Sequence, residues 1–130
     1  MATLDDVATL ALGLPEVAET DYRDRRAWSV RGKTFAWERP FSKADIKRYG
    51  DEVPPELPVL GVRTDGLVEK EALLADPPPG VFHIPHFNGY PGVLVELGRI
   101  SDDDLRDVLL DAWLATAPAE LADRHRSEQG

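Results

Sequence analysis

The sequence predicts one domain, spanning residues 1–130, that combines α-helices with β-strands. A chain of 130 residues is long enough to bury one hydrophobic core and short for two domains of typical size. Apolar residues recur at the helical period near both ends of the chain, and shorter runs between them follow the two-residue period of strands. The chain also carries 10 glycines and 11 prolines, which indicate many turns within a compact fold.

The first helix is predicted to begin after Thr3, a suitable N-cap residue. Asp5 and Asp6 fall in its first turn, where the helix dipole favours negative charge. Gly13 and Pro15 end it. Its apolar positions have the spacing i, i+3, i+4 and i+7, and they are Leu4, Val7, Ala8 and Ala11.

A period of two begins near Arg25 and predicts a β-hairpin, with its turn at Gly32-Lys33 or one residue earlier at Arg31-Gly32. In either register we expect four side chains to share one face of the hairpin, namely Trp28, Val30, Phe35 and Trp37. This face is expected to be core.

The middle of the chain predicts a short helix over residues 43–49 with Ser42 as its cap, and then a strand over residues 57–63. Asp65 is the expected cap of a further helix over residues 66–75. Two strands follow, over residues 81–84 and 93–97, and the second is apolar enough to occupy a central place in a sheet. Ser101 is expected to cap the best amphipathic helix in the chain, and a short helix over residues 119–125 follows it.

The net charge of −9 is unevenly distributed. Residues 21–50 hold nine basic and four acidic residues, a local charge of +5 that leaves −14 for the rest of the chain. If these cations share one surface, they could bind the phosphates of DNA, since nucleic-acid affinity depends largely on Lys and Arg. The candidate DNA-contacting residues are Arg25, Arg26, Arg31, Lys33, Arg39, Lys43, Lys47 and Arg48.

The sequence lacks the residues and motifs that several classes of function require. There is no cysteine, which excludes a disulfide or a thiolate site and fits a reducing cytoplasm. No secretory signal, membrane span, phosphate-binding loop or nucleophile motif is apparent. We therefore expect a cytoplasmic, monomeric protein that is not an enzyme, has no cofactor or membrane partner, and binds DNA or another protein.

The loop at residues 85–92 is the alternative site, because it gathers polar and aromatic groups next to two strands. Its candidate ligand-binding residues are His83, His86, Asn88 and Tyr90. The two histidines are three residues apart, and in an extended strand they would point to opposite faces. We therefore expect a surface for a protein or a small ligand here and no metal site.

Three segments together resemble the MmcQ/YjbR-like family of small bacterial proteins over most of the chain. The first is the hairpin over residues 28–36 downstream of Leu14-Pro15-Glu16-Val17; the second is Gly89-Tyr90-Pro91-Gly92 with the strand after it; the third runs from Asp104 to Trp113 and closes with Ala117-Pro118. The resemblance implies an α+β fold, a curved antiparallel sheet with helices packed on one face, similar to frataxin-like and double-wing arrangements. Family members commonly carry the label of DNA-binding protein, which rests on fold analogy.

Overall fold

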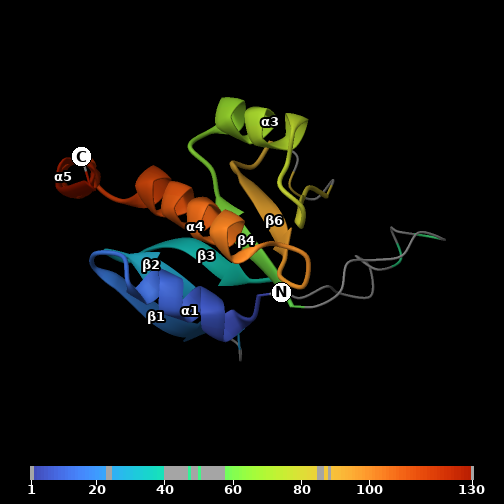
Figure 1. The fold of residues 1–130 in the computed structure, drawn as a ribbon, viewed down its shortest axis with the longest axis horizontal. Coiled ribbons are helices and arrows are strands. Elements are labelled where there is room, and N and C mark those ends of the chain that lie inside the picture. Colours follow the sequence, from blue (N-terminus) through green and yellow to red (C-terminus); the bar gives the residue numbers. More distant parts are fainter. Residues whose placement is uncertain are drawn as a thin grey trace.

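A computed structural model describes residues 2–22, 25–39, 47, 50, 58–84, 87 and 89–129 of the chain. Figure 1 shows the order of its helices and strands. The strands are β1 (Val17–Tyr22), β2 (Arg25–Val30), β3 (Lys33–Glu38), β4 (Val59–Arg63), β5 (Val81–Phe82) and β6 (Gly92–Glu96). The helices are α1 (Leu4–Leu12), α3 (Leu67–Ala75), α4 (Asp102–Thr116) and α5 (Ala119–Gln129).

The strands form one six-stranded antiparallel sheet in the order β1-β2-β3-β4-β6-β5. α1 packs on β1 and β2, and α4 packs on β3 and β4, so both helices cover the same face of the sheet (Figure 1). The α+β fold that the resemblance implies is confirmed. We call the opposite face, which neither α1 nor α4 covers, the open face.

The two helices on the sheet begin where their caps predict. The hydroxyl of Thr3 accepts a hydrogen bond from the Asp6 amide, and the Asp6 carboxylate accepts one from the Thr3 amide, which completes a capping box at α1. Ser101 caps α4 through the amide of Asp104. The cap predicted for α3 is wrong: this helix begins after Gly66, and Asp65 makes no capping hydrogen bond.

The hairpin of β2 and β3 turns at Arg31 and Gly32, whose φ angles of 47° and 83° are both positive, as a type I′ turn requires. The register shifts after Trp28, so that Trp28 pairs with Ala36 and Ala27 pairs with Trp37. The shared face predicted for Trp28 and Trp37 is therefore wrong. Because cross-strand partners point the same way, the two tryptophans lie on opposite faces of the sheet.

The main hydrophobic core fills the space between the sheet and the two helices. Trp28, Phe35 and Trp113 are its largest members, and each is fully buried. A second, smaller cluster lies on the open face and consists of Val59, Ile84, Phe87 and Leu94, with Trp37 and Phe82 packed against it. β6 contributes to both clusters because it is paired on both sides and buried along its whole length.

One strand of the sheet was missed by the sequence analysis, and one predicted helix falls outside the described residues. Strand β1 was not predicted, because its residues Val17–Tyr22 show little apolar alternation. The helix predicted over residues 43–49 lies outside the described part of the chain, apart from Lys47. Among the described residues, no helix has both the length and the apolar character needed to cross a membrane.

Candidate functional site

A row of paired residues crosses the open face of the sheet. Trp37 of β3 pairs with Ala27 of β2 on one side and with Gly61 of β4 on the other. Gly61 pairs in turn with Leu94 of β6. Since directly paired residues point to the same face, this row identifies the side chains that are turned away from α1 and α4.

Three rings, Trp37, Phe87 and Tyr90, meet on the open face and form what we call the aromatic cluster. Ring centroids lie 6.4 Å apart for Trp37 and Phe87, 6.3 Å for Trp37 and Tyr90, and 5.4 Å for Phe87 and Tyr90. Tyr90 stands edge-on to both neighbours, an arrangement that aromatic pairs favour. Phe87 is buried, Trp37 is half-buried and Tyr90 is 36% exposed, so part of the cluster remains accessible.

Glycines make room for the two accessible rings. A Cβ at Gly61 would collide with the indole of Trp37, which shows that this ring lies flat on the β4 backbone. A Cβ at Gly92 would lie 2.7 Å from Cε1 of Tyr90. Both glycines are therefore required for close approach of a ring to the backbone, which is a common reason for glycine inside a strand.

Two arginines flank the aromatic cluster on the open face. The guanidinium carbon of Arg39 lies 6.0 Å from the centroid of Phe87, and that of Arg63 lies 5.7 Å from the centroid of Tyr90. Both distances suit cation–π contacts. Arg63 is half-buried and forms no ion pair with any other described residue, and its Nε atom is buried without a hydrogen-bond partner there.

Lys70 of α3 holds the loop that carries Phe87 and Tyr90. Its ammonium group donates hydrogen bonds to the carbonyl oxygens of Phe87 and Tyr90, at 2.5 and 2.7 Å. The side chain is only 5% exposed, and this burial lowers the pKa of Lys70. A buried amine with two backbone acceptors is best explained as a clamp that fixes the position of the two rings.

The structure separates the eight predicted DNA-contacting residues into several groups. Arg25, Lys33 and Lys47 are exposed, and Arg39 flanks the aromatic cluster. Lys43 and Arg48 lie outside the described residues. The remaining two, Arg26 and Arg31, are neutralised by carboxylates.

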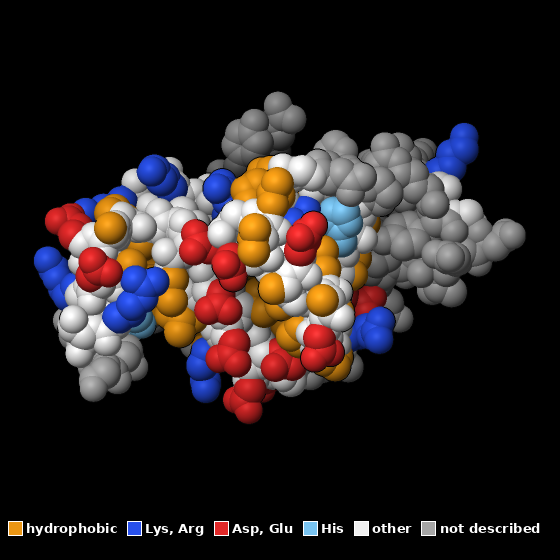
Figure 2. Space-filling model, turned by 90° about the horizontal axis from the view of Figure 1, so that it is seen from above, with side chains coloured by type: hydrophobic (Ala, Val, Ile, Leu, Met, Phe, Trp, Pro, Cys, Tyr) orange, Lys and Arg blue, Asp and Glu red, His pale blue; other side chains and the backbone are white. Residues whose placement is uncertain are grey.

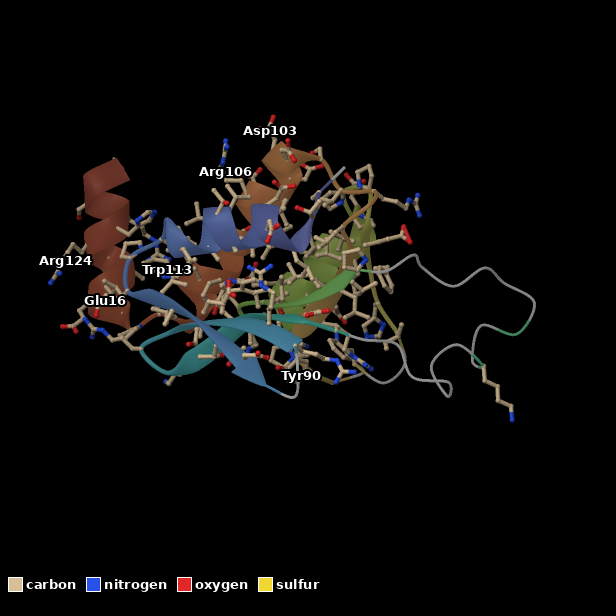
Figure 3. All side chains as sticks on the ribbon, turned by 90° about the horizontal axis from the view of Figure 1, so that it is seen from below. Glu16, Tyr90, Asp103, Arg106, Trp113 and Arg124 are labelled. Carbon is tan, nitrogen blue, oxygen red and sulfur yellow. The ribbon has the colours of Figure 1, made fainter. Side chains whose placement is uncertain are left out.

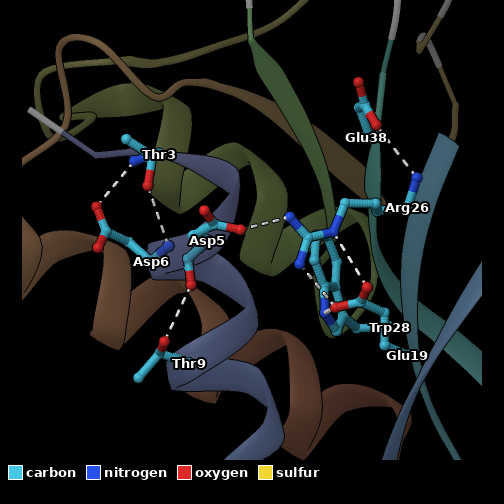
Figure 4. Close-up of polar contacts among 8 residues, drawn as sticks. All are labelled: Thr3, Asp5, Asp6, Thr9, Glu19, Arg26, Trp28 and Glu38. Carbon is cyan, nitrogen blue, oxygen red and sulfur yellow. Dashed lines mark hydrogen bonds and ion pairs between the residues drawn. The ribbon is translucent and has the colours of Figure 1, made fainter.

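Arg26 lies on the helical side of the sheet, where it is paired twice (Figure 4). Its guanidinium contacts Asp5 of α1 at 2.9 Å and Glu19 of β1 at 3.0 Å. Glu19 also accepts a hydrogen bond from the indole of Trp28, and these donors hold the pKa of Glu19 below its ordinary value. The prediction that Arg26 is available to phosphates is therefore not supported by its contacts.

Arg31 is paired in the same way at the hairpin turn. It contacts Glu16 at 2.9 Å and Glu120 of α5 at 2.7 Å. Hydrogen bonds from Arg31 lower the pKa of Glu16 and of Glu120. This network ties the hairpin to α5, so Arg31 has a structural role and little positive charge to offer a ligand.

Charge is divided between the two sides of the molecule. Among the described strand residues that point to the open face, Arg25 and Arg63 are cationic, and the only carboxylate is Glu96, which pairs with Arg99 at 3.5 Å. The helical side carries the acids: α4 alone contributes Asp102, Asp103, Asp104, Asp107 and Asp111. Figure 2 shows acidic side chains gathered in the middle of that view, and Figure 3 shows Tyr90 on the side of the sheet away from Asp103.

The alternative loop site overlaps with this face. Tyr90 belongs to the aromatic cluster, whereas His83 is half-buried and its Nε2 atom has no hydrogen-bond partner among the described residues. His86 and Asn88 lie outside the described part of the chain. No group of three or more potential metal ligands occurs among the residues that the structure describes.

Two cavities adjoin Arg63. One, of about 510 Å³, lies beside Tyr90 and is lined by Lys33, Thr34, Trp37, Arg63, Tyr90, Ala115 and Thr116. The other, of about 280 Å³, lies between the end of β4 and α3, α4 and α5, and its lining includes Asp65, Glu69 and Asp111. Burial raises the pKa of Asp111, with a further contribution from Asp107.

Sequence reasoning missed several residues of this site. Trp37 was assigned to the core, and Arg63, Phe87 and Lys70 were not candidates. A lysine at a sheet-facing position of α3 was the one available signal, since a buried lysine needs partners. The partners of Lys70 are backbone atoms 17 and 20 residues away, which no local pattern reveals.

Comparison with known proteins agrees with the resemblance seen in the sequence. The family model YjbR matches residues 12–115. Uncharacterized proteins of Mycobacterium bovis and Mycobacterium tuberculosis are each 44% identical to this chain over 133 residues, with full coverage of both chains. No solved structure gives a significant match. With its family model covering most of the chain, including β2, β3, β4, β6 and the aromatic cluster, the chain belongs to the YjbR family.

Proposed function

We propose that this protein binds single-stranded nucleic acid on the open face of its sheet, without catalysis. The observation that carries the proposal is the aromatic cluster with the guanidinium of Arg63 beside it. Partly exposed rings stack on unpaired bases, and neighbouring cations contact the phosphates between them. We also propose that the protein acts in the cytoplasm, because a chain without cysteine forms no disulfide and so needs no oxidising compartment.

The net charge of −9 favours a single strand over a duplex as the ligand. Binding to a duplex depends mainly on many phosphate contacts, and few cations on this face are available for them. Stacking adds about 1–3 kcal/mol per base and requires bases that are free of a complementary strand. A face with two accessible rings and few available cations therefore suits a short single strand.

This proposal moves the DNA-binding site away from the basic segment at residues 23–48. Arg26 and Arg31 are no longer candidate contacts because carboxylates neutralise them. Arg63 of β4 is added as a candidate phosphate contact, and Trp37 is added as a stacking ring. Arg25 remains as a phosphate-contacting residue.

The proposal is tested by fluorescence anisotropy with labelled single-stranded DNA, single-stranded RNA and duplex DNA, each over a series of salt concentrations. We expect single strands to bind more tightly than the duplex. With Arg25 and Arg63 at the phosphates, log K should fall with log salt with a slope of about −1.4.

Matched variants identify the face that binds. Arg63→Gln should weaken binding and make the salt slope shallower, whereas Arg31→Gln should leave both unchanged because Arg31 is already paired with Glu16 and Glu120. Equal effects of the two substitutions, or no binding to any of the three ligands, would reject the proposal. In the second case, the 85–92 loop remains the candidate site for a protein or small ligand.

A further inference from the structure

We infer that the cavity beside Tyr90 holds one phosphorylated nucleotide unit, with its phosphate between Lys33 and Arg63; this inference rests on the proposed function and specifies its ligand. The cavity opens where the pairing of β3 with β4 ends, at Ala36 and Val62. Its volume of about 510 Å³ lies within the range of small-molecule sites.

The charges around this cavity select an anion. Lys33 and Arg63 line it, and none of the described residues in its lining is a carboxylate. Lys33 is exposed and forms no ion pair with another described residue. Arg63 likewise forms no ion pair with another described residue, so its guanidinium is available to a phosphate.

One feature of the cavity disfavours an anion, but its charge is smaller than that of the two cations. Ala115 and Thr116 belong to the last turn of α4, where the helix dipole places the equivalent of about half a negative charge. The two side-chain cations carry two full positive charges. The balance therefore favours an anion.

The uncharged lining completes a nucleotide site. Trp37 and Tyr90 supply an aromatic wall for a base, and the Arg63 guanidinium lies over the Tyr90 ring. Thr34 is exposed, and its hydroxyl has no hydrogen bond to another described residue, so it can donate to a phosphate oxygen. The hydroxyl of Thr116 already donates to the carbonyl of Ala112.

The phosphate can belong to a free nucleoside monophosphate or to the end of a strand. Isothermal titration calorimetry with adenosine monophosphate, adenosine and inorganic phosphate tests the first source. Anisotropy with the same oligonucleotide carrying a 5′-phosphate, a 3′-phosphate or neither tests the second. We expect the phosphorylated ligand of at least one source to bind about tenfold more tightly than its unphosphorylated counterpart, the effect of one charge-assisted contact.

Variants in the cavity separate this inference from the proposed function, because Lys33 and Thr34 lie outside the aromatic cluster. Lys33→Gln and Thr34→Val should abolish the preference for the phosphorylated ligand, whereas Lys47→Gln, which removes an exposed cation away from the cavity, should retain it. Thermal melting of each variant verifies that it is folded. If the wild-type protein binds internal segments of a single strand but shows no preference for a phosphate in either assay, the inference is overturned and the proposed function stands. A preference that survives both cavity substitutions also overturns it.

Discussion

The indole of Trp37 lies directly on the backbone of Gly61, at a distance that leaves no room for a Cβ. The two residues are cross-strand partners in β3 and β4. This contact fixes the plane of the ring on the open face, and the same ring lies 6.3 Å from Tyr90. The position of the Trp37 ring on the open face therefore depends on Gly61, which has no side chain.

Gly61→Ala should lower both the free energy of unfolding and the affinity for single strands. The added methyl group forces the indole away from β4, and such overpacking costs about 1–3 kcal/mol. Chemical denaturation and anisotropy measure the two effects. The matched control is Gly98→Ala, where a Cβ would meet nothing within 4 Å and no large change is expected. Equal stability of the two variants would show that Trp37 moves aside without cost.

Much of the fold was predictable from the sequence, because the signals for it are local. The capping box of α1, the Ser101 cap of α4 and the turn at Arg31-Gly32 each depend on residues within a few positions of one another. The open face was not predictable. The irregular register between β2 and β3 reverses the side chain of Trp37, and a shift of one residue moves a ring from core to surface.

The candidate site was only partly predictable for a related reason. The basic residues are visible in the sequence, but their partners are distant: Arg31 pairs with Glu120, 89 positions away. Which cations remain available to a ligand is decided by these long-range pairs. Composition therefore indicates a basic segment, whereas the fold determines which of its cations are paired with carboxylates.

Tyr90→Ala should weaken binding of single strands by about 1–3 kcal/mol, the usual contribution of one stacked base. Tyr90→Phe is the matched variant, because it keeps the ring on Gly92 and removes only the hydroxyl. The affinity of Tyr90→Phe for single strands, measured by anisotropy, should therefore be close to that of the wild-type protein. A loss of affinity as large for Tyr90→Phe as for Tyr90→Ala would mean that the hydroxyl, and not the ring, contacts the ligand.

Lys70→Met should destabilise the protein by about 1–3 kcal/mol, because the carbonyls of Phe87 and Tyr90 lose their donor. It should also weaken single-strand binding, since the loop that carries both rings loses its clamp. Lys47→Met, at an exposed position, is the control for loss of a lysine charge. Denaturation and anisotropy on both variants test this, and intact binding by Lys70→Met would exclude the clamp.

The lowered pKa of Lys70 adds a pH dependence to the same residue. Between the pKa in the folded protein and the ordinary lysine value, the unfolded chain binds more protons than the folded one. Stability therefore rises with pH across this alkaline window as the penalty for burying the charge is relieved. Denaturation over an alkaline pH series should show this rise in the wild-type protein and its absence in Lys70→Met, and parallel profiles would contradict it.

The network of Arg31 predicts a pH dependence on the acid side. Hydrogen bonds from Arg31 lower the pKa of Glu16 and Glu120, so the folded protein keeps both carboxylates ionised at pH values where the unfolded chain protonates them. The stabilisation is fully present above the ordinary glutamate pKa of about 4.3 and is lost as the pH falls through the folded values. Arg31→Gln should therefore reduce the melting temperature at neutral pH and flatten its decline below this range.

Arg25→Gln removes an exposed arginine that forms no ion pair with another described residue, so its melting temperature should decline with acid as steeply as that of the wild-type protein. A wild-type slope in Arg31→Gln would mean that solvent screens these exposed pairs completely, because surface ion pairs often contribute little.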